Sequence, residues 1–226
     1  MKNKVYLMVI AIITVAMNSF AQTADKDGNT YTTVTIGTQL WLAENLNVTR
    51  FRNGDTIPEA GTSAEWEKAG TQGKPAWCYY DNDPKNGKKY GKLYNWWAVN
   101  DPRGLAPEGW HIPKIEEWTK LCNFLGKKYK YDFNKVMKAT SGWNDDGNGT
   151  NKSGFTGLPG GYRNFSGGTS NGIGYYGYWW SSSDSGGYYA FSHTLTYTQT
   201  NILGGSQYWA CGLSVRCIRN DTNLII

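Results

Sequence analysis

The residues whose types could support chemistry gather in one stretch of the chain, residues 158–184, which reads LPGGYRNFSGGTSNGIGYYGYWWSSSD. Glycine pairs beside serines occur in backbone loops that bind phosphate and in turns that expose a nucleophilic serine. A phosphate loop closes with Gly-Lys-Ser or Gly-Lys-Thr, which the chain lacks, and the serine run SSSDSGG does not supply the Gly-x-Ser-x-Gly pattern of a nucleophile turn. The remaining interpretation is a rigid scaffold of loops that presents aromatic side chains.

Acid–base catalysis has few candidate residues. The chain contains two histidines, His111 and His193. His193 shares its parity with the apolar residues of an alternating stretch, which predicts a histidine of the core, and His111 is flanked by Trp110 and Ile112. A glycosidase needs two carboxylates that face a cleft, and no spacing selects a pair from Glu44, Glu108, Glu116, Glu117, Asp145 and Asp146. We therefore predict no catalytic residue and expect a protein that is not an enzyme.

Metal binding has weak support in the sequence. Two histidines exclude a histidine-rich centre, and no Cys-x-x-Cys pair indicates zinc. Three acidic turns are similar to the first residues of a calcium loop: DKDGN at 25–29, DNDPKNG at 81–87 and DDGNGTN at 145–151. Residues 25–29 are not followed by the acidic ligand of an EF-hand, and we interpret the other two as Asx turns. We predict no metal site and no cofactor, with calcium as the weak alternative.

Aromatic residues are the outlier of the composition. They make up 15 % of the chain, with 11 tryptophans and 16 tyrosines. A core of this size buries only part of them, and flat rings on a surface suit sugars and protein partners. The composition therefore favours a binding protein.

The N-terminal 21 residues have the organisation of a secretory signal peptide. MKNK is positively charged, VYLMVIAIITVAM is apolar but short for a membrane span, and NSFAQ carries small residues at Ser19 and Ala21. We expect cleavage after Ala21, with an uncleaved anchor as the alternative, and no lipid anchor because no cysteine follows the apolar run. No later stretch approaches the roughly 20 apolar residues of a membrane span. The mature protein is expected to be secreted, periplasmic or bound at the cell surface, without membrane insertion.

The charge of the chain argues against a nucleic-acid partner. The formal net charge is +5, and removal of Lys2 and Lys4 with the signal leaves 21 basic and 18 acidic residues, or +3. The nearest approach to a basic stripe, residues 127–130, is interpreted as the solvated end of a helix. We expect a glycan or a surface protein as the ligand.

The cysteines fit an exported protein. Cys78, Cys122, Cys211 and Cys217 are an even number, which predicts two disulfides. Four cysteines allow three pairings, and the spacing does not select one of them.

Hydrophobic periodicity predicts the elements that position these residues. Residues 25–51 alternate around Gly37 and predict two short strands, and residues 109–128 contain the clearest helix, with apolar residues three and four apart and Gly126 at its end. Residues 190–202 alternate between an apolar and a threonine face, which predicts a strand with one buried face. The other expected segments are short helices at 64–70 and 132–140, turns at 81–91 and a closing strand at 212–220.

Six ordered blocks resemble a family of exported bacterial proteins, the Fibrobacter succinogenes major paralogous domain. The blocks are DKDGNTYTTVTIGTQLWLAENL, YGKLYNWWAV, APEGWHIPKIEEWTKL, SGFTGLPGGYRN, GYWWSSS and GLSVRCIRN, and the resemblance covers residues 25–220 as a single domain. GWHIPKIEEW and GLSVRC are also similar to segments of formylglycine-generating enzymes. The resemblance implies an α+β chain with the C-type-lectin-like fold of the formylglycine-generating-enzyme subclass: two short helices, a small twisted antiparallel sheet and long loops.

The chain departs from formylglycine-generating enzymes at their reactive cysteines. Those enzymes bind copper through a cysteine pair before the closing strand, whereas residues 181–210 contain no cysteine. The resemblance therefore does not imply oxidase chemistry. It places Cys122 and Cys217 at structural cysteine positions, but Ala106 stands where the disulfide partner of Cys217 would be, which leaves one of the other two cysteines as the replacement.

The segment from GYWWSSS to GLSVRC is similar to the variable region of proteins diversified by retroelements, in which the last strands present a ligand-binding face. That resemblance implies a fixed backbone with exposed side chains that contact a ligand.

We expect a non-catalytic binding or adhesion module. The alternatives are a structural subunit of a surface appendage or matrix, or an enzyme on the same scaffold. Trp179 and Trp180 are expected to straddle the core and a groove. The expected ligand-binding residues are Tyr175, Tyr176, Tyr188, Tyr189, Asn201, Gln207, Tyr208 and Trp209.

Overall fold

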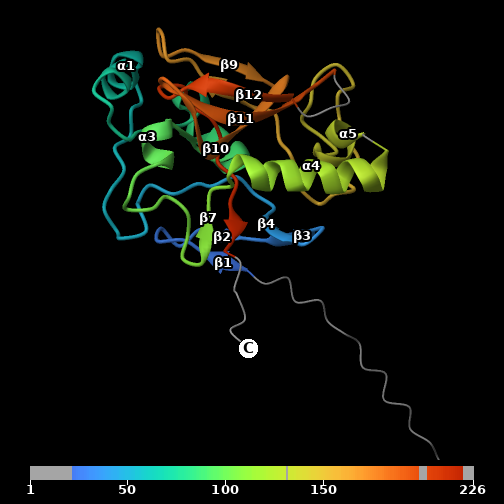
Figure 1. Ribbon diagram of the computed structural model, residues 1–226. Coiled ribbons are helices and arrows are strands. Elements are labelled where there is room, and N and C mark those ends of the chain that lie inside the picture. Colours follow the sequence, from blue (N-terminus) through green and yellow to red (C-terminus); the bar gives the residue numbers. More distant parts are fainter. Residues whose placement is uncertain (1–21, 131, 199–202, 221–226) are drawn as a thin grey trace, which may run out of the picture.

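Two main β-sheets and the helices packed against them form the fold (Figure 1). The structure is a computed structural model that describes residues 22–130, 132–198 and 203–220. The signal peptide predicted over residues 1–21 lies outside these residues. The α+β class expected from the sequence is confirmed, but the sheets, of five and four strands, are more extensive than the small sheet expected.

A four-stranded antiparallel sheet joins the two ends of the described chain. Its order is β3-β4-β13-β7, with β3 at Thr33–Ile36, β4 at Gln39–Leu42, β7 at Trp110–His111 and β13 at Ile218–Arg219. The two short strands predicted around Gly37 are β3 and β4, and the φ of +65° at this glycine lets the chain turn between them. The closing strand expected over 212–220 is regular only at β13, where Ile218 pairs with both Trp41 and His111. Two short hairpins, β1 (Thr23–Ala24) with β2 (Thr30–Tyr31) and β5 (Trp77–Cys78) with β6 (Leu93–Tyr94), accompany it.

A five-stranded sheet of order β12-β11-β10-β8-β9 forms the other half of the fold. Its strands are β8 (Gly160–Arg163), β9 (Ser170–Ile173), β10 (Tyr176–Gly186), β11 (Tyr189–Thr196) and β12 (Leu203–Tyr208). Neighbouring strands are antiparallel except β8 and β10, which are parallel. In β10, Trp179 lies opposite His193 and Trp180 lies opposite Ser192. Since successive side chains of a strand point to opposite faces, the two tryptophans leave the sheet on different sides.

The strand β10 therefore separates two hydrophobic cores. Trp179 packs in one core with Trp41 and Trp118, and Trp180 packs in the other core with Trp96. Both tryptophans of β10 are less than 2 % exposed. The expectation that they straddle a core and a groove is wrong, because each of them faces a core.

The strand predicted over residues 190–202 corresponds to β11, which ends at Thr196. One face was expected to be buried and the threonine face to be open. Instead both faces are buried, including Ser192, Thr194 and Thr196. The reason is that the sheet has a core on each side, which the alternation within a single strand does not reveal.

The longest helix, α4 (Ile115–Tyr129), lies between the two sheets (Figure 1). Its apolar residues, spaced three and four apart as predicted, are buried against strands of both sheets. The prediction that Gly126 ends the helix is wrong. Gly126 is buried inside α4, and the chain leaves the helix at Lys130, which has a φ of 53°. Packing between two sheets overrides the preference of glycine for helix ends.

The described residues contain five α-helices, more than the two short ones implied by the resemblance and the three predicted from periodicity. The remaining four are α1 (Ser63–Thr71), α2 (Pro84–Tyr90), α3 (Trp96–Val99) and α5 (Phe133–Met137). The helix α1 begins at a capping box formed by Thr62 and Glu65. The helix α2 forms where turns were expected, because Asp83 accepts the backbone N–H of Lys85 and Pro84 occupies the first helical position.

The cysteines are free thiols where two disulfides were expected. Cys78, Cys122, Cys211 and Cys217 are all unpaired. Cys78 is buried in a small cluster with Trp66, whereas Cys211 and Cys217 are buried in the core that contains Trp180. Burial raises the pKa of the Cys78 and Cys217 thiols to about 12. These cysteines therefore act as small apolar side chains of the packing.

The closing segment buries an arginine that has no carboxylate partner in the described part of the chain. Arg216 is 0 % exposed, and its guanidinium donates to the carbonyl oxygens of Leu42, Ala43 and Phe155 and to Oδ1 of Asn45. Its Cζ also lies 4.3 Å from the centroid of the Phe155 ring. Burial lowers the pKa of Arg216 to about 9. This side chain fastens the closing segment to the end of β4 and to the loop that precedes β8.

Candidate functional site

Four large apolar side chains of the described residues are well exposed. Phe165, Tyr175, Tyr188 and Tyr189 have exposed fractions of 47, 36, 62 and 48 %. Isolated exposed apolar residues are common on protein surfaces, whereas contiguous ones mark surfaces that bind. Three of the four, all except Tyr175, contact one ring, that of Tyr208.

We define the aromatic patch as Phe165, Tyr188, Tyr189, Tyr208 and Trp209. The ring centroid of Tyr208 lies 4.8 Å from that of Phe165, 5.5 Å from that of Tyr189 and 6.2 Å from that of Tyr188. The Tyr188 centroid lies 5.5 Å from that of Trp209. These residues come from the loop after β8, the turn between β10 and β11 with the start of β11, and the end of β12. Three segments thus form one group of rings.

Backbone geometry fixes the turn that carries Tyr188 and Tyr189. The two glycines before Tyr188 have φ values of +97° and +63°, which suit glycine, and they close the hairpin between β10 and β11. Tyr189 then pairs with Tyr208 across the strands, and the N–H of Trp209 donates to the carbonyl of Tyr188 at 2.8 Å. The exposed rings therefore stand on a regular hydrogen-bonded backbone.

Trp209 connects the patch to the core. Its ring stacks on that of Trp96 with centroids 4.7 Å apart and an interplanar angle of 18°, and it meets the ring of Trp97 edge-on at 6.1 Å. Trp96 is buried and Trp209 is half-buried. Trp209, one of the expected ligand-binding residues, therefore packs against the core and also remains partly accessible to a ligand.

Tyr175 and Tyr176, which were also expected to bind ligand, lie at the other end of β10. Tyr176 opposes Thr196 at the end of β11, whereas the patch lies at the hairpin between these strands. Ten residues of strand at a rise of about 3.3 Å each place the two sites roughly 30 Å apart. Both tyrosines contact the ring of Tyr197, at centroid distances of 5.1 and 6.5 Å. The structure therefore does not bring these two residues to the patch.

Two expected ligand-binding residues remain, Gln207 and Asn201, and one residue of the patch, Phe165, was not expected. Gln207 is half-buried on β12 beside Tyr208, and Asn201 lies outside the described residues. Phe165 was not among the expected ligand-binding residues, because it precedes the segment that resembles diversified variable regions. Its place in the aromatic stretch 158–184 was the signal that could have identified it.

His193 is a residue of the core, as its parity predicted. It is 5 % exposed, and its ring stacks on that of Trp118 with centroids 4.4 Å apart and an interplanar angle of 15°. Its Nδ1 has no hydrogen-bond partner among the described residues. Burial lowers the pKa of His193 to about 4, so the ring is neutral at physiological pH.

The pH dependence of stability tests the burial of His193. Its ordinary pKa is 6.5, so between pH 6.5 and about 4 the unfolded chain binds a proton that the folded chain does not. Acidification therefore lowers the free energy of unfolding, by about 2 kcal/mol at pH 5 relative to its value above pH 6.5. Urea unfolding at several pH values measures this loss. His193→Phe keeps a ring on Trp118 and should remove it, whereas the same loss in that variant would mean that another group titrates.

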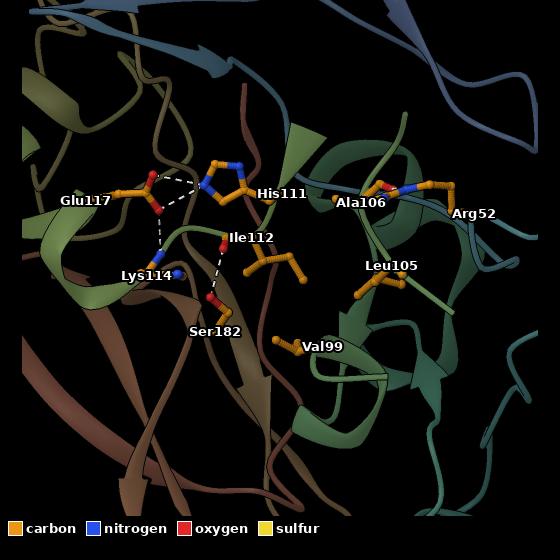
Figure 2. Close-up of a pocket in the computed structure, with 10 residues that line it drawn as sticks. Arg52, Val99, Leu105, Ala106, His111, Ile112, Lys114, Glu117 and Ser182 are labelled. Carbon is orange, nitrogen blue, oxygen red and sulfur yellow. Dashed lines mark hydrogen bonds and ion pairs between the residues drawn. The ribbon is translucent and has the colours of Figure 1, made fainter. Parts of the chain in front are cut away.

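A cavity of about 440 Å³ lies beside His111, between the start of α4 and residues 99–106 (Figure 2). The Nε2 atom of His111 lies 2.9 and 3.0 Å from the carboxylate oxygens of Glu117, and Nδ1 lies 2.7 Å from Oδ1 of Asn220. The hydrogen bond to Glu117 raises the pKa of His111. Glu117 also accepts the backbone N–H of Lys114 at 2.8 Å, as expected for a residue that caps a helix. Its pairing with His111 was not predicted from the sequence.

Comparison with known protein families identifies the chain. Residues 34–219 match the model of the Fibrobacter succinogenes major domain. The chain belongs to this family. The membership confirms the resemblance carried by the six sequence blocks. No curated protein and no solved structure gives a significant match to the chain. Membership in the Fibrobacter succinogenes major domain family does not by itself define an activity, so function has to be argued from the site.

The histidines of this Fibrobacter succinogenes major domain are poorly placed to activate a serine. Both ring nitrogens of His111 are engaged and His193 is buried. Ser182 lines the cavity beside His111, but its hydroxyl donates to a backbone carbonyl at 2.9 Å. Residues 168–172, GTSNG, do match the nucleophile pattern, which the sequence analysis missed. They lead into β9 rather than from a strand into a helix, and Ser170 Oγ accepts a backbone N–H at 2.9 Å.

Two of the three acidic turns of the domain make local hydrogen bonds of the Asx type. Oδ1 of Asp25 accepts the backbone N–H groups of Asp27 and Asn29, at 2.9 and 3.0 Å. Asp83 similarly serves as the cap of α2. Within the described residues, no three histidine, cysteine, aspartate or glutamate side chains are grouped so that they could hold a metal ion. None of the described helices has the length and apolar character needed to cross a bilayer.

Proposed function

We propose that this protein is an exported, non-catalytic binding or adhesion module that presents the aromatic patch to a glycan or protein ligand. The observation that carries the proposal is the patch itself. Tyr188 and Tyr189 are 62 and 48 % exposed and contact further rings, although the molecule has two cores able to bury aromatic side chains. Exposed rings of this kind supply large contact areas with few rotatable bonds.

Pre-organisation supports the binding role. The Tyr188 turn is closed by two glycines and by the hydrogen bond from Trp209, and Trp209 is stacked on the buried Trp96. A ligand therefore meets rings whose backbone is already ordered, which lowers the entropic cost of binding. Binding hot spots are enriched in tyrosine and tryptophan for the same reason.

The resemblances found in the sequence support the same role for the patch. We infer the C-type-lectin-like fold of the formylglycine-generating-enzyme subclass from the motifs GWHIPKIEEW and GLSVRC. In the diversified variable regions that the C-terminal segment resembles, the last strands present the ligand-binding face. Tyr189 and Tyr208 of the patch lie on β11 and β12, and Tyr188 and Trp209 adjoin these strands. The signal peptide expected over residues 1–21 would direct the module to the outside of the cell or the periplasm. We propose that the four cysteines serve as packing residues there.

A binding array tests this function directly. The exported protein is applied to arrays of glycans and of surface proteins, with and without calcium. We expect saturable binding to one ligand class, unchanged by chelation, because Asp25 and Asp83 use their carboxylates for backbone hydrogen bonds and helix capping. Binding to neither array, together with self-assembly of the protein in sedimentation experiments, would favour a structural subunit instead.

A further inference from the structure

The cavity beside His111 has the composition of a small-molecule site. Its volume of about 440 Å³ lies within the usual range for ligand pockets. Four of its lining residues are buried and apolar: Val99, Leu105, Ala106 and Ile112. Its charged lining residues are Arg52, His111, Lys114 and Glu117. The cavity thus combines an apolar wall with a polar rim.

The charge that faces the cavity is positive. Glu117 hydrogen-bonds His111 and accepts the backbone N–H of Lys114, so its carboxylate oxygens are already engaged. Arg52 and Lys114 are not part of any ion pair found among the described residues. Figure 2 shows these two side chains on opposite sides of the view, with His111 and Ile112 between them. Two cations therefore remain for an anionic ligand.

Arg52 is held in position before any ligand arrives. Its Nε donates to the carbonyl of Ala106 at 3.0 Å, and its Nη2 donates to the carbonyl of Trp110 at 3.1 Å. Its Nη1 makes no hydrogen bond within the described chain. Gly104, with a φ of +79°, lies so close that an added Cβ would be 3.2 Å from Cζ of Arg52. A guanidinium fixed in this way binds a carboxylate with little loss of side-chain entropy.

We propose that this cavity binds a small organic acid, with its carboxylate on Arg52, with Lys114 adding positive charge at the rim, and with its apolar body against Val99, Leu105 and Ile112. The site is independent of the aromatic patch and of the ligand bound there. The guanidinium supplies directed, charge-assisted hydrogen bonds, and Lys114 supplies a second positive charge. The apolar wall selects acids with a hydrocarbon or aromatic body over inorganic anions.

Nuclear magnetic resonance titration of the full exported protein tests the proposal. The probes are hexanoate and phenylacetate, compared with hexanamide, phenylacetamide and hexylamine at equal ionic strength. We expect saturable shifts at the backbone amides of residues 104–106 and 111–114 with the acids, and at least tenfold weaker binding of the amides and the amine. Equal affinity for the acid and its amide, or no saturable shift with either acid, would overturn the proposal.

Charge variants assign the effect to the cavity. Lys114 is exposed, so Lys114→Glu should fold normally and weaken acid binding about tenfold or more, whereas Lys85→Glu on α2, outside the cavity, should leave it unchanged. Arg52→Gln should weaken binding further. If Arg52→Gln does not fold, the comparison of Lys114→Glu with Lys85→Glu decides the matter. A tripeptide that ends in leucine, with a free or an amidated C-terminus, tests whether the cavity binds peptide C-termini rather than small organic acids. Tighter binding of the peptide acid than of hexanoate would contradict a small-acid site.

Discussion

Replacement of Arg216 by methionine is expected to lower the free energy of unfolding by about 4 kcal/mol. The guanidinium is fully buried and serves acceptors on four residues: Leu42, Ala43, Asn45 and Phe155. Methionine fills much of the same volume but removes the donor to the carbonyl oxygens of Leu42, Ala43 and Phe155 in a region that water does not reach. Oδ1 of Asn45 keeps only the hydrogen bond from Nε1 of Trp179. The main cost is that buried acceptors are left without hydrogen bonds, rather than that a charge is removed.

Arg219→Met is the matched control for this prediction. Arg219 lies three residues away and is exposed, so the same chemical change should alter the free energy of unfolding by less than about 0.5 kcal/mol. Arg216→Lys should resemble the methionine variant, because an ammonium cannot reach acceptors on several sides of the guanidinium plane. Urea unfolding monitored by tryptophan fluorescence measures all three. A change below 1 kcal/mol for Arg216→Met would show that the closing segment is held by packing alone.

The local elements were predictable where the cause is local. The strands β3 and β4 follow from alternation on either side of Gly37, and the start of α1 follows from the Thr62 cap. The body of α4 follows from apolar residues three and four apart. In each of these cases the sequence within one segment contains the whole signal.

The errors arise where distant segments decide the outcome. Gly126 remains helical because α4 is packed between two sheets, and the threonines of β11 are buried because a second core covers them. The cysteines fit an exported disulfide protein by number, but all four are free thiols: Cys78 lies in a different cluster from Cys211 and Cys217, which share a core without a bond between them. Neither the neighbours of a buried face nor the pairing of cysteines can be derived from one sequence.

The candidate site was predicted in part. Composition pointed to surface aromatic residues, and Tyr188, Tyr189, Tyr208 and Trp209 do form one group. Which of the tyrosines share a surface depends on strand register, and Tyr175, beside the far end of β10, lies apart from them. The cavity beside His111 was not foreseen, because its lining comes from segments between residues 52 and 182.

Replacement of both Tyr188 and Tyr189 by alanine is expected to weaken ligand binding at least 100-fold. These are the most exposed rings of the patch, and each carries the contact area of a typical binding hot spot. Because both side chains lie mostly in solvent, the melting temperature should change by less than about 3 °C. Trp209→Ala should behave differently and lose stability by about 2 kcal/mol or more, since it removes the stack on the buried Trp96.

Tyr175→Ala supplies the matched control for the patch. Tyr175 is 36 % exposed and belongs to the tyrosine group at the other end of β10. Its loss removes the same side chain, from the turn between β9 and β10, without touching the patch. Ligand affinity should therefore stay within about twofold of the unmodified protein.

The most direct test of the binding module is a paired measurement of ligand affinity and melting temperature for the Tyr188→Ala/Tyr189→Ala protein, the Tyr175→Ala protein and the unmodified protein. The ligand is the one identified on the glycan and surface-protein arrays. We predict that only the double variant loses binding and that all three proteins melt within about 3 °C of one another. Undiminished binding by the double variant would contradict the proposed role of the patch, and a large fall in its melting temperature would show that these rings serve the fold.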